Sequence, residues 1–234
     1  MNKRIALILS AMLIMSGCST IKTNELTLVE AEQLNTKSLT YTKYNELPDF
    51  AAQTAVNVQF GMLGVASAVS SGNAMMIRNN IRDPAFKIAQ ALAKKIGSKH
   101  NVKVVKNKQE IPLSSSIPSI VSQHPGHDYI LDVKTTNWGS IYFMNDWDNY
   151  KINYFAHARL IDTSTKAVVA EVLCSSNPEV ADTNLAPSYE ALESGVGIRS
   201  ELAKSIEYCV DYIIAEANIN GDKIMPEAVA KSDF

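Results

Sequence analysis

Residues 150–161 read Tyr-Lys-Ile-Asn-Tyr-Phe-Ala-His-Ala-Arg-Leu-Ile, and apolar and polar side chains alternate along most of this stretch. A period of two is typical of a strand with one buried face and one solvated face. Residues 128–136 alternate in the same way, and residues 167–174 follow the polar, turn-forming residues 162–166. These segments predict an antiparallel meander of three strands with one polar face.

Helical patterns lie on both sides of this meander in the sequence. Asp83 and Pro84 predict the start of a helix, and Gly97 stands where a left-handed C-cap would end it. Residues 189–217 carry a long second pattern, with apolar residues recurring every three or four positions.

Two further strands are predicted at residues 38–44 and 102–105, where short β-type patterns occur. Together the elements predict the α/β (α+β) class, with a mostly antiparallel sheet and helices packed on one face. We expect a single domain over residues 37–220, because its length suits one well-buried core. Residues 221–234 are expected to form a C-terminal tail.

Residues 1–17 have the pattern of a signal peptide: two basic residues, then an apolar stretch of about 11 residues that is too short to span a bilayer. Residues 14–18, Ile-Met-Ser-Gly-Cys, resemble the lipobox of bacterial lipoproteins, although Met15 stands where that family usually has Leu. The resemblance implies cleavage before Cys18, a diacylglycerol on its thiol and an acyl group on its amine. No other cofactor is expected.

The resemblance also implies a location. Ser19 follows the cysteine, where Asp would favour the inner membrane, so we expect a lipid anchor in the outer membrane of a Gram-negative envelope and a domain facing the periplasm. Anchoring by two or more acyl chains is stable. Residues 18–36 are then expected to be a lipidated tether that is partly ordered at most. The alternative is an ordinary signal peptide followed by a chance cysteine.

Charge limits the classes of partner. The mature chain after residue 17 would carry 20 basic and 24 acidic residues, a formal net charge of −4. Nucleic acid and anionic headgroups call for clustered Lys and Arg, so neither is expected as the main partner. The expected partners are the membrane, through the anchor, and other envelope proteins; homo-oligomerisation is left open.

Cys174 and Cys209 are the cysteines that remain after lipidation, an even pair in an oxidising compartment. Cys174 would share a strand face with Ala170 and Val172, while Cys209 lies on the apolar stripe of the last helix. We expect a disulfide, because a helix packed on that face would bring the two together. The alternative is two separate buried thiols.

Residues 50–77 contain no charged side chain and many Gly, Ala and Ser. The run is long enough for a transmembrane helix, but Asn57 and Asn73 would be costly in hydrocarbon. We expect a buried or surface-docked helix with a Gly/Ser-rich loop. An oligomer contact and membrane insertion are the alternatives.

Five aromatic residues lie between the first two meander strands and suggest a partner-binding or lipid-binding patch, because aromatics are enriched at interfaces. They are Trp138, Tyr142, Phe143, Trp147 and Tyr150. The alternative is that they form ordinary core at the end of the sheet.

Catalytic and metal motifs are scarce. His124, His127 and Asp128 could supply zinc ligands, but the proline and glycine between the histidines indicate a turn, so no metal site is expected. Asp146 and Asp148 leave two-carboxylate glycoside hydrolysis open. Nucleophile-elbow, zinc-helix and phosphate-loop motifs do not occur, so we expect no enzymatic activity.

The order of elements, with Asp-Tyr-Ile-Leu-Asp-Val at 128–133 and Leu-Ile-Asp-Thr-Ser-Thr-Lys-Ala-Val-Val-Ala at 160–170, resembles a group of periplasmic lipoproteins. It comprises auxiliary lipoproteins of ABC-type lipid transporters and, more distantly, the curli-secretion lipoprotein and the amino-terminal domain of TolB. The likeness covers residues 80–218 and implies assembly or transport rather than catalysis.

The expected function is therefore that of a non-catalytic, lipid-anchored interaction domain, an accessory subunit of an envelope assembly, transport or secretion complex. One alternative is an envelope hydrolase acting on glycan or peptide, which a pocket with convergent polar groups would favour. Another is an oligomeric, pore-forming secretion lipoprotein that inserts residues 50–77. A flat aromatic end without a pocket would favour the interaction domain.

Overall fold

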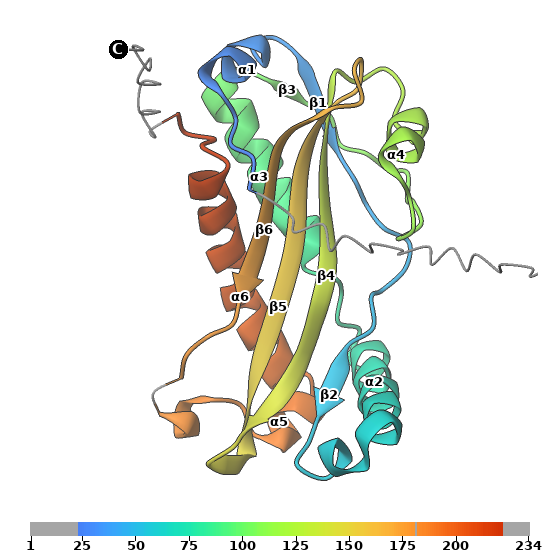
Figure 1. Cartoon of the computed structure of the whole chain (residues 1–234), viewed down its shortest axis with the longest axis vertical. Helices are drawn as coiled ribbons and strands as arrows, with labels where there is room; N and C mark the ends of the chain where they lie inside the picture. Colours follow the sequence, from blue (N-terminus) through green and yellow to red (C-terminus); the bar gives the residue numbers. More distant parts are fainter. Residues whose placement is uncertain (1–22, 181, 222–234) are drawn as a thin grey trace, which may run out of the picture.

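The computed structural model describes residues 23–180 and 182–221, so the expected signal peptide, Cys18 and residues 222–234 lie outside it. It has an α+β fold, which confirms the predicted class (Figure 1). The strands are β1 (Ser38–Tyr41), β2 (Ala51–Gln53), β3 (Lys103–Val104), β4 (Tyr129–Phe143), β5 (Asp146–Asp162) and β6 (Val168–Ser176). The helices are α1 (Leu28–Gln33), α2 (Gly61–Arg78), α3 (Ala85–His100), α4 (Ile117–Gln123), α5 (Tyr189–Glu193) and α6 (Val196–Glu216), with 3-10 turns η1 (Asn57–Phe60) and η2 (Thr183–Leu185).

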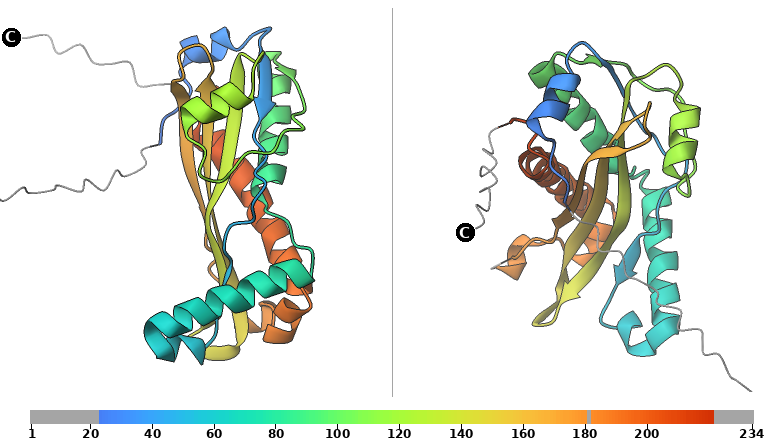
Figure 2. Two further views of the ribbon diagram at one scale, coloured as in Figure 1. Left: turned by 90° about the vertical axis from the view of Figure 1, so that its right-hand side faces the viewer. Right: turned by 45° about the horizontal axis from the view of Figure 1, so that its top comes forward.

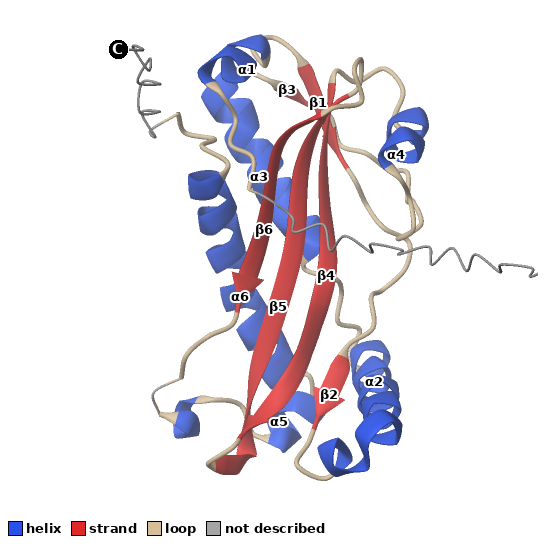
Figure 3. Cartoon of the chain, viewed as in Figure 1, coloured by secondary structure: helices blue, strands red, loops and turns tan. Residues whose placement is uncertain are grey.

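One six-stranded sheet in the order β3-β1-β4-β5-β6 organises the chain, with β2 added alongside β4 (Figure 3). Strands β4, β5 and β6 form the predicted antiparallel meander, in which Val133 lies opposite Ala158 and Ala158 opposite Val172. Strand β1 is parallel to both β3 and β4, and β2 pairs in parallel with the later part of β4. The sheet is therefore mixed at the β1 edge.

The β4–β5 hairpin is longer than predicted. Residues between the two predicted strands continue the ladder to the Phe143–Asp146 pair, after a β-bulge between Thr135 and Asn137 and a second register shift between Tyr142 and Phe143. The bulge shifts the alternation by one position, so a simple period of two ends there in the sequence although the strand does not.

Helices α3 and α6 cover one face of the sheet, as Figure 2 shows. Leu92 and Ile96 of α3 and Ile198 and Ile213 of α6 are buried there against the apolar faces of β4, β5 and β6. Burying each such side chain contributes about 1.5–3 kcal/mol. This layer confirms the predicted packing of helices on the meander.

The short helix α4 lies on the other face, an exception to the predicted one-sided arrangement. Its Ile120 is fully buried with Ile130 of β4 and Ile161 of β5 in a separate small cluster. These strand residues point away from α3 and α6, so the face predicted to be polar needs an apolar cover at this end.

Two predicted helix boundaries need correction. Helix α3 does begin after Asp83, whose Oδ1 accepts a hydrogen bond from the N–H of Ala85 at 2.8 Å. It runs past Gly97 to His100, and its C-cap is Asn101, which has a φ of 52°. A Cβ atom at Gly97 would lie 2.6 Å from Cγ2 of Val104, so this glycine permits close packing rather than capping. The long final pattern is split into α5 and α6 at Gly195, with φ 73°.

The expected tether is wrong from residue 24 onward. Leu26 and Leu34 are buried in the main core, and α1 lies between them, closed by a capping box of Thr27 and Glu30. The N–H of Asn24 donates to the carbonyl of Glu171 at 2.8 Å, which attaches the segment to β6. The domain therefore begins more than ten residues before position 37.

The predicted disulfide between Cys174 and Cys209 is present, with Cα atoms 5.6 Å apart. Cys174 lies on the buried face of β6, and Cys209 lies on the buried stripe of α6. The bond joins the last helix to the edge strand of the meander.

Candidate interaction surface

Small residues on one side of α2 set its position. Gly64, Ala68 and Gly72 recur at every fourth position and are buried against the body of the molecule. A Cβ atom at Gly72 would lie 2.0 Å from the carbonyl oxygen of Phe50, and one at Gly64 would lie 1.7 Å from that of Asn57. The glycines therefore let α2 approach the backbone next to β2 and η1 without clashes.

Two asparagines fasten α2 to the same backbone. Asn57 donates from Nδ2 to the carbonyl of Ala52 at 2.9 Å and accepts the N–H of Thr54 at 2.8 Å. Asn73 accepts the N–H of Phe50 at 2.9 Å and donates to Asp49 at 2.7 Å. The amides that appeared costly for a membrane helix thus bind the protein itself. Because α2 is continuous, the expected Gly/Ser-rich loop is absent from residues 61–78.

The opposite side of this segment exposes large apolar side chains. We call residues 56–65 the apolar tip; its large apolar side chains that are exposed are Val56, Val58, Phe60, Met62, Leu63 and Val65, with Met62 90% and Leu63 80% exposed. The tip carries no charge. An exposed apolar group of this size on a folded protein usually marks an interaction site. By length and composition alone, Asn57–Arg78 is also the one described helical stretch that could cross a membrane.

Two of the five aromatic residues predicted to bind a partner belong to the core instead. Trp138 is 1% exposed, donates from Nε1 to the carbonyl of Pro48 at 3.0 Å and lies edge-on to Phe50. Tyr150 is 5% exposed and packs on Tyr189. Both point to the helix-covered face of the sheet, so the prediction is wrong for these two residues.

The turn of the β4–β5 hairpin leaves the other aromatics near solvent. Trp147 is 62% exposed and lies edge-on to the half-buried Tyr142, with ring centroids 6.4 Å apart, and Phe143 is also half-buried. Met144 beside them is 91% exposed. We call Met144 and Trp147 the hairpin tip. The hairpin tip and the apolar tip lie at the same end of the molecule, away from α1 and α4 (Figure 1).

A groove of about 480 Å³ lies between the N-terminal part of α3 and the chain that follows β1. Its lining includes Lys43, Glu46, Arg82, Asp83, Phe86 and Gln90. Oδ1 of Asp83 accepts hydrogen bonds from Thr135 and from the backbone of α3, and burial raises the pKa of its carboxyl group above the usual value. Polar groups therefore converge in this groove, although the carboxylate of Asp83 already accepts a hydrogen bond at the start of α3.

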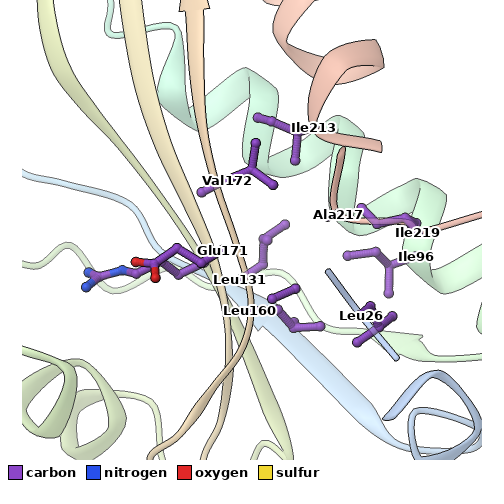
Figure 4. Close-up of a pocket in the computed structure, with 12 residues that line it drawn as sticks. Leu26, Ile96, Leu131, Leu160, Glu171, Val172, Ile213, Ala217 and Ile219 are labelled. Carbon is purple, nitrogen blue, oxygen red and sulfur yellow. The ribbon is translucent and has the colours of Figure 1, made fainter. Parts of the chain in front are cut away.

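A second cavity, of about 20 Å³, lies inside the core between the sheet, α3 and α6 (Figure 4). Apolar side chains surround it, and the labelled carboxylate of Glu171 points away from it toward the other face of the sheet. A space this small and apolar holds one water at most. It is a packing defect rather than a ligand site.

No protein-family model matches the sequence, and no curated protein matches it. Solved structures to which the chain is similar include protein XCC0632 of Xanthomonas campestris (11% identity, 87% of this chain and 97% of that chain, TM-score 0.40) and the PelC dodecamer of Paraburkholderia phytofirmans (11%, 85% and 96%, 0.35). Lipoprotein GNA1162 of Neisseria meningitidis is another (16%, 72% and 99%, 0.28). These identities and scores are too low to assign the chain to a family.

The histidine cluster considered for a metal has other bonds in the structure. His124 is buried, with Nδ1 2.7 Å from the carbonyl of Ile120 and Nε2 2.6 Å from Nδ2 of Asn107. Asp128 instead accepts hydrogen bonds from the backbone and hydroxyl of Ser38, which lower the pKa of its carboxyl group. Within residues 23–180 and 182–221, no group of three potential metal ligands occurs.

Sequence reasoning missed the most exposed parts of this surface. The uncharged run was evident, but its buried and exposed sides were not separated. Met144 was missed because a single methionine in a turn carries no pattern. The signal that could have found the apolar tip is the placement of glycines and alanine at 64, 68 and 72, which marks the inward side.

Proposed function

We propose that the protein is a non-catalytic, lipid-anchored interaction domain and an accessory subunit of a bacterial envelope complex. The anchor is Cys18, on the resemblance of residues 14–18 to a lipobox. The contact surface is the end of the molecule that carries the apolar tip and the hairpin tip.

The observation that carries this proposal is the exposure of a group of large apolar side chains at one end of the domain. Met62 and Met144 are each at least 90% exposed, and Leu63 is 80% exposed. Apolar surface gathered in this way favours contact with another apolar surface, because burial removes it from water. The disulfide supports an oxidising compartment such as the periplasm.

The buried ionisable side chains also support a non-catalytic role. Asp132 is fully buried and bonded to Arg159, and Asp83 is bonded to Thr135 and to the backbone at the start of α3. These groups hold strands and helices together. Asp132 is closed off from solvent, whereas a catalytic carboxylate would need an open approach for substrate.

Lipidation is tested with labelled palmitate in cells. Wild-type protein should incorporate the label and Cys18→Ala should not, leaving an unprocessed precursor. The Ser19→Ala change, which leaves the lipobox cysteine in place, is the matched control and should be labelled normally. Equal labelling of the Cys18→Ala variant and wild type would refute the anchor.

Partner contact is tested by placing a photo-crosslinking amino acid at Trp147, in the hairpin tip, and separately at Lys99, near the C-terminal end of α3 at the other end of the molecule. We expect adducts with envelope proteins from position 147 and fewer from position 99. Equal adduct formation at both positions would argue against a specific contact surface.

The groove is the observation that favours the alternative of an envelope hydrolase. In that case Asp83 would be the general acid, because burial raises the pKa of its carboxyl group. Asp83→Asn should abolish complementation of a deletion strain if the protein is a hydrolase, and should leave complementation intact if it is an interaction domain. The folded state of the variant is checked by circular dichroism.

A further inference from the structure

We propose that the apolar tip, residues 56–65, dips into the surface of the lipid bilayer while the rest of α2 stays on the protein. The inference rests on the proposed anchoring, which would hold the domain at a membrane. The tip contacts the hydrocarbon at the edge of the bilayer. It inserts peripherally and does not span the membrane.

The chemistry of the tip suits hydrocarbon rather than charged headgroups. Residues 50–77 carry no charged side chain, and the nearest charge along α2 is Arg78, about 24 Å from Met62 along the helix axis. Phe60, Met62 and Leu63 are mostly exposed and have no polar atoms. Interfacial insertion of this kind depends on buried apolar area, and without basic residues it gains nothing from anionic lipid.

The tip lies on the side of the sheet on which the described part of the chain begins. In the left view of Figure 2, η1 and the first turns of α2 project past the sheet on the side opposite to α3 and α6, and the segment before α1 lies on that same side. Asn24 is fixed to β6 by hydrogen bonds to Glu171. Five residues separate Cys18 from Asn24, so the six steps between their Cα atoms reach at most about 20 Å when fully extended. A lipid on Cys18 therefore keeps this side of the domain close to the bilayer.

The packing of α2 favours peripheral insertion over spanning the membrane or pairing with another helix. The small-residue side, which close helix pairs in membranes use, is already occupied by the protein's own backbone at Phe50 and Asn57. Spanning the bilayer would detach α2 and expose Asn57 and Asn73, whose amides are bonded to β2 and its flanks.

The test uses unlipidated protein that starts at Ser19, which retains every described residue of the core. The protein is mixed with phosphatidylcholine vesicles and separated by flotation. The tip variant is Met62→Asp with Leu63→Asp, and the control variant is Leu28→Asp with Val29→Asp. Both pairs are adjacent, exposed and in the first turn of a helix, where Asp favours the helix dipole, so neither should unfold the chain.

We expect the tip variant to bind vesicles at least about tenfold more weakly than wild type, with the control variant unchanged. Binding of wild type should not change between low and high salt or on adding phosphatidylglycerol. Equal binding by the tip variant and wild type, or no binding by wild type, overturns the proposal. Sedimentation of the same proteins tests whether the tip instead binds a second copy of the chain. A dimer that the tip substitutions dissociate would make the tip an interface between copies and would also overturn the proposal.

A conservative variant guards against loss of structure. Phe60→Trp keeps the tip apolar, and its emission should shift to the blue and be quenched by brominated lipid more than that of wild type; unchanged emission overturns the proposal. The vesicle experiments use protein without the lipid anchor, so their results do not depend on the palmitate experiment. The proposal of membrane insertion and the proposal of lipid anchoring can therefore fail separately.

Discussion

Asp132 binds several parts of the sheet together. Its carboxylate is fully buried and accepts hydrogen bonds from Thr42 at 2.9 Å, from Tyr44 at 2.6 Å and from Nε and Nη2 of Arg159 at 3.0 and 2.5 Å. These residues join the end of β1 to β4 and β5. The network satisfies the carboxylate completely, as a buried charge requires.

Removing this carboxylate should destabilise the fold strongly. Asp132→Ala leaves the Arg159 guanidinium without its partner in a largely buried position, so we expect the free energy of unfolding to fall by about 3 kcal/mol. Asp148→Ala, at an exposed position in the same β4–β5 hairpin, should change it by less than about 0.5 kcal/mol. Urea denaturation of both variants measures the difference, and equal effects would contradict the network's role.

Asp83 should make the free energy of unfolding depend on pH, in the opposite direction to an acid in a salt bridge. Burial raises the pKa of its carboxyl group above 3.8, although hydrogen bonds from Thr135 and Ala85 partly lower it. Between 3.8 and the folded-state pKa the folded protein binds more protons than the unfolded chain, so this group's contribution to stability falls as pH rises. Asp83→Asn removes the ionisation, so the variant should gain stability relative to wild type from pH 4 to pH 7. Urea denaturation across that range measures the difference; a constant difference would disprove the raised pKa.

At the scale of elements, the disulfide holds α6 on the meander. It joins residues 35 positions apart in the chain, and a loop of this length should stabilise the fold by about 4 kcal/mol in the chain-entropy model. The double variant Cys174→Ala with Cys209→Ala should therefore unfold at much lower urea concentration. Dithiothreitol should lower the midpoint of wild type and leave that of the variant unchanged; a reductant effect on both would point to another cause.

The contact of α2 with β2 should depend on Gly72. In Gly72→Val the new Cβ atom would start 2.0 Å from the carbonyl oxygen of Phe50, so α2 must move away, at a cost of about 2–3 kcal/mol. Ser71→Val, at the neighbouring exposed position, has the same β-branched side chain in the same helix and should cost much less. Hydrogen exchange of α2 reports the movement: faster exchange is expected only in the first variant.

The elements differ in how far the sequence could predict them. The β5 alternation over residues 150–161 and the capped start of α3 gave correct elements because local residue patterns determine them. Strand β2 is only Ala-Ala-Gln and has no strand pattern of its own; it forms because it pairs with residues 139–141 of β4. The extension of the hairpin beyond Thr135 was missed because a bulge breaks the period there. Strand β2 and the hairpin extension were therefore not predicted because both depend on pairing between strands.

At the scale of the whole molecule, the N-terminal segment is part of the core. Leu34 is fully buried, so Leu34→Ala should lower the free energy of unfolding by about 3 kcal/mol, whereas Leu28→Ala on the exposed side of the preceding helix α1 should change it by less than about 0.5 kcal/mol. A true tether would show no difference between the two variants. Thermal denaturation of both measures it.

The candidate site was only partly predictable for the same reason. Residues 50–77 were singled out because they lack charge, and Trp147 because it is aromatic and close to a turn. Whether Trp138 and Tyr150 face solvent or core depends on the register of β4 and β5 and on the helices that cover them. Those are properties of the assembled sheet and not of the local sequence.

The attachment of Asn24 to β6 should limit aggregation of this protein at high local concentration. Its side-chain amide donates to the carbonyls of Val168 and Val169, and its backbone exchanges two hydrogen bonds with Glu171. An unpaired strand edge is a template for polymerisation, and this one residue occupies the first half of the β6 edge. The opposite edge is β3, only two residues long. Neither border of the sheet therefore offers a long free ladder from which aggregation by strand addition could begin.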